Sequence, residues 1–113
     1  MLQVGKKIEI ADLNQFREMN VREALQVLTS QIQKFWSWGA HAQTNIKNRA
    51  LRIMVNGHHH KGHVYVVVNG LDLYQFILTT SMGTITYISD DCYMEDLVDI
   101  IDRKIEYIPD YAD

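Results

Sequence analysis

The feature that most constrains this sequence is a series of four β-type segments between residues 50 and 88, with a turn signal after each of the first three. The segments read ALRIMV, HVYVVV, LYQFILTT and TITYIS, and they are separated by Asn56-Gly57, Asn69-Gly70 and Met82-Gly83. Asn-Gly favours a tight turn because both residues tolerate positive φ. Strands joined by connections this short run antiparallel to their neighbours. The pattern therefore predicts a four-stranded antiparallel meander.

Amphipathic helices are predicted on both sides of these strands. Residues 21–36 carry apolar side chains at three- and four-residue steps, after Asn20 as N-cap and with Glu23 in the capping-box position. Residues 92–106 repeat the pattern after Asp90 and Asp91, whose charges favour a helix N-terminus. We predict one α+β domain over residues 1–113, in the order helix, four-stranded antiparallel meander, helix. Both helices pack on one sheet face, and residues 1–19 form an N-terminal arm or edge strand.

The two faces of the predicted sheet are both rich in apolar residues. One face is apolar apart from a tyrosine hydroxyl, so we assign it to the core: Leu51, Ile53, Val55, Val64, Val66, Val68, Tyr74, Phe76 and Leu78. The other face includes Met54, Tyr65, Val67 and Ile77, which is more apolar than a solvated face should be. If both helices cover the first face, these side chains form an exposed patch for a partner or a dimer. The alternative is that the N-terminal segment or one helix covers them.

Length and composition indicate an ordinary globular chain. The 113 residues fit one domain, and 47% of them are apolar. Cys92 is the single cysteine, so no intramolecular disulfide forms and no oxidising compartment is needed. The N-terminus lacks the apolar stretch of a secretory signal, and no apolar run is long enough to span a membrane. We expect a cytoplasmic protein that does not contact membranes.

Charge is distributed unevenly along the chain. Residues 1–63 contain nine Lys or Arg and four Asp or Glu, whereas residues 64–113 contain two and ten. Such asymmetry is typical of a polyanion-binding half or an acidic interaction face. It is also what two complementary solvated surfaces would give.

A histidine-rich turn, NGHHHKGH, follows the first predicted strand. Three imidazoles with an open fourth position suit a metal, which makes His58, His60 and His63 a candidate set with His41 in reserve. The cluster holds no carboxylate, and adjacent histidines in a turn diverge, so a metal site is the least favoured interpretation. A second interpretation is phosphate contact together with the nearby cations, Lys47, Arg49, Arg52 and Lys61. The third is an exposed, permissive turn.

Trp38 and the last helix supply further candidate contacts. Phe35 and Trp36 fit the apolar stripe of the first helix, whereas Trp38 lies beyond it and is freer to bind a partner. The last helix carries a row of carboxylates, of which Asp99 and Asp102 are the candidate binding residues. No nucleophile elbow, phosphate loop or metalloprotease motif is visible. We therefore predict a non-enzymatic protein without a cofactor.

Two resemblances bear on function. The order of elements is similar to double-stranded-RNA-binding domains, but the lysines with which those domains grip phosphate are replaced here by the acidic DDCYMEDL. The segment from SWG through ALRIMVNGHHHKGHVYVVVNGLDLYQFILTT resembles small uncharacterised proteins of phages and mobile elements of gut Bacteroidetes. This second resemblance covers about residues 36–108 and implies no catalytic or binding residue. It favours a role in interaction with the host.

The leading hypothesis is a small protein-interaction module that binds another protein or a second copy of itself. Its candidate contacts are Met54, Tyr65, Val67, Trp38, Asp99 and Asp102. One alternative is nucleic-acid binding through Lys47, Arg49, Arg52, Lys61 and the histidines. The other alternative is the histidine-ligated metal site.

Overall fold

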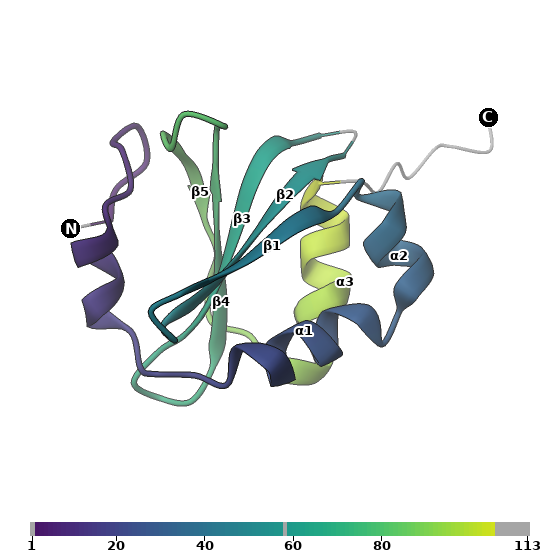
Figure 1. The fold of residues 1–113 in the computed structure, drawn as a ribbon, viewed down its shortest axis with the longest axis horizontal. Coiled ribbons are helices and arrows are strands. Elements are labelled where there is room, and N and C mark those ends of the chain that lie inside the picture. Colours follow the sequence, from purple (N-terminus) through teal and green to yellow (C-terminus); the bar gives the residue numbers. More distant parts are fainter. Residues whose placement is uncertain (1, 58, 106–113) are drawn as a thin grey trace.

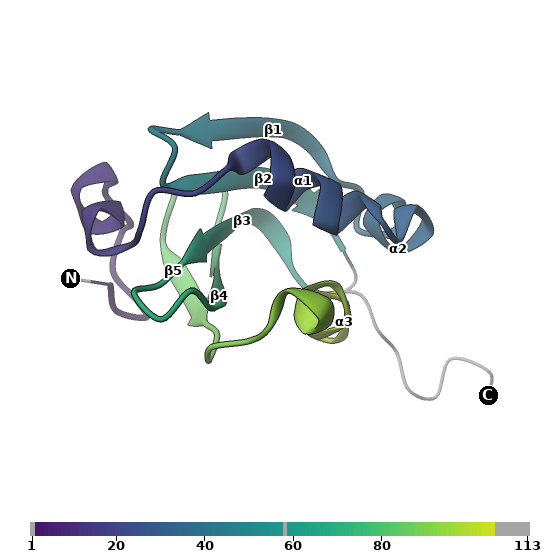
Figure 2. The ribbon, with the colours of Figure 1, turned by 90° about the horizontal axis from the view of Figure 1, so that it is seen from below.

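The computed structural model, which describes residues 2–57 and 59–105, is an α+β fold built on one antiparallel sheet. The five strands lie in the order β1-β2-β3-β4-β5. The α-helices cover one side of the sheet, and the N-terminal segment lies on the other side (Figures 1 and 2). The elements are the 3-10 helix η1 (Ile10–Gln15), α1 (Val21–Thr29), α2 (Ile32–Ser37), β1 (His41–Ile46), β2 (Ala50–Asn56), β3 (Lys61–Val68), β4 (Tyr74–Thr79), β5 (Ile85–Ile88) and α3 (Met94–Ile105).

The predicted meander is confirmed, but its strand count is wrong. Strands β2 to β5 coincide with the four predicted segments, and each pairs antiparallel with the next. The additional strand, β1, pairs with β2 at the edge of the sheet. Its sequence, HAQTNI, shows no apolar alternation because most of it is exposed. An edge strand without a buried face leaves no periodic signal to detect.

The β3–β4 turn forms by a different mechanism from the one that Asn-Gly predicts. Gly70 does not adopt positive φ, whereas Asp72 has φ +64°, and in the β2–β3 hairpin Gly62 has φ +142°. In the β3–β4 turn, the side-chain oxygen of Asn69 instead accepts bonds from the backbone N–H groups of Leu71 at 2.9 Å and Leu73 at 3.2 Å. Gly62 is needed for space, because a Cβ there would lie 2.3 Å from the Thr79 carbonyl oxygen.

The predicted helix over residues 21–36 is two helices. Asn20 caps α1 as expected, since its side chain accepts a 3.1 Å bond from the Glu23 N–H. The helix ends where the Thr29 and Ser30 hydroxyls donate to the carbonyls of Leu25 and Val27, at 2.9 and 2.6 Å. Such local bonds compete with helix continuation. The break changes the direction in which the α2 side chains point.

The core between the helices and the sheet is the predicted one. Side chains from β2, β3 and β4 meet α1, α2 and α3, and the largest contributors are Leu28, Phe35, Trp38, Ile53, Phe76, Leu97 and Ile101. The last helix begins at Met94, two residues later than predicted, because Cys92 is in a β-bridge with Tyr74. Its predicted end at Glu106 lies outside the described residues.

The second sheet face is covered, so the predicted exposed patch is wrong. Leu13 of η1 and Phe16 pack on Tyr65, Val67 and other residues of this face. Tyr65 is only 7% exposed and Val67 is 0% exposed, while Met54 is half-buried. The alternative considered from the sequence, coverage by the N-terminal segment, is what the structure shows.

The same segment also pairs with the open edge of β5. The Gly5 N–H donates to the Ile85 carbonyl at 2.8 Å, and the Ile85 N–H donates to the Lys6 carbonyl at 2.8 Å. Ile8 then donates to the Gly83 carbonyl at 2.9 Å. The N-terminal segment is therefore bound to the sheet by backbone hydrogen bonds as well as by apolar contacts.

We expect Leu13→Ala to lower the free energy of unfolding by about 2–5 kcal/mol. The substitution removes a fully buried side chain from the apolar cluster between the N-terminal segment and the second sheet face. Urea denaturation would measure the loss. Ile10→Ala, in the same 3-10 helix but 55% exposed, is the control and should change stability by about 0.5 kcal/mol. Equal small effects of both substitutions would show that the segment is not packed on the sheet.

Candidate functional site

The helix break reverses the expected roles of the two tryptophans. Trp38 was predicted to be free, but it is 1% exposed and packs beside Phe35, with ring centroids 5.8 Å apart. Trp36, predicted to be in the core, is 68% exposed. Ile32, one turn earlier on α2, is 38% exposed. The outer face of α2 therefore exposes a large aromatic side chain, Trp36, one helical turn from the partly exposed Ile32.

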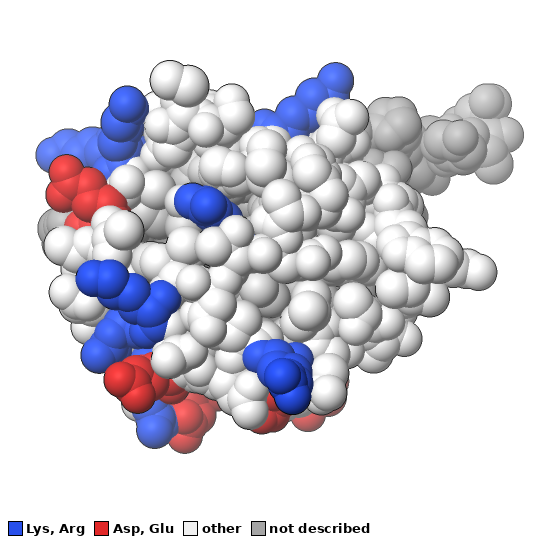
Figure 3. Space-filling view, in the orientation of Figure 1, with Lys and Arg blue, Asp and Glu red and all other residues white. Residues whose placement is uncertain are grey.

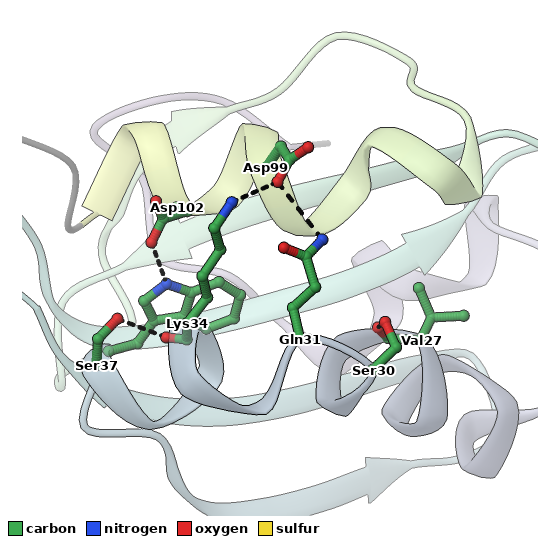
Figure 4. Close-up of polar contacts among 8 residues, drawn as sticks. Val27, Ser30, Gln31, Lys34, Ser37, Asp99 and Asp102 are labelled. Atoms are coloured by element: carbon green, nitrogen blue, oxygen red, sulfur yellow. Dashed lines mark hydrogen bonds and ion pairs between the residues drawn. The ribbon is translucent and has the colours of Figure 1, made fainter.

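The predicted acidic contacts join α3 to α2. The Trp38 Nε1 donates to Asp102 Oδ1 at 2.9 Å (Figure 4). Asp99 Oδ1 accepts from Lys34 Nζ at 2.6 Å and from Gln31 Nε2 at 3.5 Å. The Lys34 hydrogen bond is the main cause of the lowered pKa of Asp99. Both carboxylates stabilise the helical layer, although about half of the Asp99 side chain remains exposed.

A groove of about 340 Å³ lies between α1 and the start of α3. Its apolar lining comes from Val27, Met94 and Val98, and two carboxylates, Glu23 and Glu95, also line it. The helix carrying Val27 runs beside α3 in Figure 4. The groove combines an apolar surface with acidic residues, an arrangement that suits an apolar side chain next to a basic one.

The four predicted cations do not form one patch. Lys47 lies in the β1–β2 turn and Lys61 at the start of β3, so the length of β2 separates them by roughly 20 Å. Arg49 donates to the Phe16 carbonyl at 2.7 Å, and Arg52 lies on the second sheet face. On the face shown in Figure 3, basic side chains are scattered and several adjoin acidic ones.

The candidate metal ligands are only partly described. His58 lies outside the described residues, and His60 Nε2 lies 3.2 Å from the His63 carbonyl oxygen. Among residues 2–57 and 59–105, no group of three His, Cys, Asp or Glu side chains could hold a metal ion. His63 lies on the second sheet face, where the charges of Arg52 and His60 both act on it.

A cavity of about 280 Å³ opens between the N-terminal segment and the second sheet face. Two of its polar side chains each have a buried nitrogen without a hydrogen-bond partner, Nε of Arg52 and Nδ1 of His63. Burial and then the charge of Arg52 lower the pKa of His63. The cavity is lined by Ile8, Glu9, Ile10, Leu13, Ile46, Arg52, His63, Tyr65, Ser81, Met82 and Gly83.

The register between β2 and β3 is what brings the two polar side chains of this cavity, Arg52 and His63, together. Arg52 pairs with Tyr65 and Met54 pairs with His63, so Arg52 and His63 are diagonal neighbours on one face. From the sequence, Arg52 was grouped with the surface cations and His63 with the turn histidines. The predicted second sheet face also includes Arg52, but the apolar pattern alone does not give the register that brings His63 beside it.

Comparison with known proteins found no family model, curated protein or solved structure that matches this chain. Within the described part of the chain, every helix is too short or too polar to cross a membrane.

We expect Asp102→Ala to lower the free energy of unfolding by about 1–2 kcal/mol, because it leaves the buried indole N–H of Trp38 without an acceptor. Asp102→Asn keeps an acceptor oxygen and should lose less. Urea denaturation of both variants would test this, and an alanine variant as stable as wild type would contradict the contact.

The pKa of His63 should lie below 6.5 in the folded protein and rise when Arg52 is replaced by glutamine. A pKa lower in the folded than in the unfolded chain means that the unfolded chain binds more protons, so stability falls as pH falls through this range. His60 shifts in the same direction through burial. NMR titration of the imidazoles would measure both, and a His63 pKa at or above 6.5 would contradict the described burial.

Proposed function

We propose that this chain is a small non-enzymatic protein-interaction module that binds its partner through the helical layer. The observation that carries the proposal is the exposure of Trp36, at 68%, with Ile32 one helical turn away. Tryptophan is enriched among the residues that dominate binding energy, because it buries a large area with few rotatable bonds. The opposite side of α2 is anchored by Phe35 and Trp38, so Trp36 is presented from a fixed helix.

The α1–α3 groove indicates what kind of partner fits. Val27, Met94 and Val98 offer an apolar surface, and Glu23 and Glu95 add negative charge. A partner segment with an apolar anchor flanked by lysine or arginine would satisfy both features. Asp99 and Asp102 line a neighbouring hollow with Lys34 and Arg103, where their remaining exposed surface gives a polar rim.

Nucleic-acid binding receives less support from the arrangement of charges. A nucleic acid is held by several cations that follow its phosphates, whereas Lys47 and Lys61 lie at opposite ends of β2 and Arg49 contacts Phe16. A second copy of the chain remains a candidate partner, since an exposed tryptophan face can also pair with itself.

Affinity capture with the purified chain, from a lysate of the cell that carries the gene with and without nuclease treatment, tests the proposal. We expect a protein captured by wild type to be reduced at least about tenfold by Trp36→Ala, because hot-spot truncations cost roughly 2 kcal/mol or more. Met82→Ala, which changes a 74% exposed side chain in the β4–β5 turn, is the matched control and should retain capture. Urea denaturation would establish that both variants remain folded.

Light scattering of the purified chain separates the two kinds of partner. A dimer that Trp36→Ala converts to a monomer would identify a second copy as the partner. A monomer with Trp36-dependent capture would identify a different protein. Capture that survives Trp36→Ala, or that nuclease abolishes, would overturn the proposed surface.

A further inference from the structure

The cavity beneath the N-terminal segment is separate from the proposed protein-binding surface. Its floor is the second sheet face, and its walls are residues 8–10 and Leu13 on one side and the β4–β5 turn on the other. The lining residues Ile10 and Met82 are 55% and 74% exposed, so they mark a mouth to solvent. A volume of about 280 Å³ is just below the usual range for ligand pockets, so it suits only a small ligand.

Arg52 is a cation without a counter-ion in this cavity. No acidic side chain among the described residues forms an ion pair with it, although Glu9 also lines the cavity. The side chain is half-buried, and its Nε is buried without a hydrogen-bond partner. A partly desolvated guanidinium is stabilised by an anion that accepts its N–H groups.

His63 adds a second polar group beside the guanidinium. Its Nδ1 is buried and has no hydrogen-bond partner. Burial and the nearby Arg52 lower the pKa of His63, so the imidazole is neutral at neutral pH and can donate one N–H. Both side chains line the cavity, so an oxygen ligand there can accept from the N–H groups that they turn toward it.

The rest of the lining selects the kind of anion. Ile8, Leu13 and Ile46 give the cavity apolar walls, which a hydrated inorganic ion would not use. The carboxylate of Glu9 disfavours a second negative charge on the ligand. Both features favour a single negative charge attached to a short hydrocarbon body.

We propose that this cavity binds a small monocarboxylate, with the carboxylate on Arg52 and His63 and the hydrocarbon body against Ile8, Leu13 and Ile46. Arginine presents N–H groups in a fork that matches carboxylate geometry. The apolar body displaces water from the walls, and the carboxylate gives Arg52 its missing counter-ion. The site lies on the sheet face opposite the helices and does not depend on the partner surface of α2.

Amide NMR titration with hexanoate, hexanol and inorganic phosphate tests this assignment. Hexanoate should give saturable shifts at Arg52, His63 and Leu13, and it should raise the thermal unfolding midpoint by linkage. Hexanol and phosphate should each bind at least about tenfold more weakly, because each lacks one half of the recognition. Equal binding of hexanol would show an apolar cavity only, and equal binding of phosphate would show a general anion site. Either outcome overturns the proposal.

Substitutions separate a built site from general attraction of an anion to exposed cations. Arg52→Gln should weaken hexanoate binding at least about tenfold, and His63→Gln should weaken it by a smaller factor. Lys61→Gln, on the same strand as His63 and with the same change in net charge as Arg52→Gln, is the matched control and should bind as wild type does. Urea denaturation verifies the fold of each variant. Hexanoate binding that is absent in wild type, or unchanged in Arg52→Gln, overturns the proposal.

Discussion

A sheet that is apolar on both faces is the constraint on which the rest of this structure depends. The central strand β3 shows it directly, because Val64 and Val66 face the helices while Tyr65 and Val67 face the other side. A half-solvated antiparallel strand would alternate apolar and polar residues instead. The chain therefore needs two covering layers. The helices form one layer, and the N-terminal segment, with Leu13 and Phe16 as its anchors, forms the other.

The two edges of the sheet are protected in different ways. Residues 5–8 exchange backbone hydrogen bonds with Gly83 and Ile85, so the β5 edge already has a partner within the chain. No described segment pairs with the outer edge of β1 in this way, but the β1 register shifts between His41 and Thr44, and Ala42 has φ +51°. Bulged, polar edge strands resist pairing with other chains. These features direct the search for a partner surface to the helical layer rather than to the sheet edges.

The elements predicted correctly from the sequence are those with a strong burial period. Strands β2 to β5, the Asn20 cap and the core face all follow from apolar spacing and short turns. Strand β1 gave no such signal, because its side chains are mostly exposed. The helix break at Ser30 depends on hydroxyl–carbonyl bonds, which compete closely with helix continuation. That one break exchanged the expected exposures of Trp36 and Trp38.

The candidate sites were harder to predict than the fold, because they depend on pairing between strands. Arg52 and His63 meet only through the β2–β3 register, which the hairpin length does not reveal while the turn geometry is unknown. Likewise, Asp99 and Asp102 appear as a free acidic row until α2 supplies Lys34 and Trp38. Residue type indicated the chemistry in each case, and tertiary structure determined which groups were already satisfied.

The two covering layers differ in how completely they fill the space over the sheet, and this difference separates the two proposed sites. The helices bring large side chains such as Phe35 and Trp38 into the core, so what remains for binding is their outer surface. The N-terminal segment contributes a short 3-10 helix whose buried residue is Leu13, followed by Phe16. A cover this thin leaves unfilled space above Arg52 and His63. A well-filled layer with an exposed tryptophan suits a macromolecular partner, whereas a thin layer over unpaired polar groups suits a small ligand.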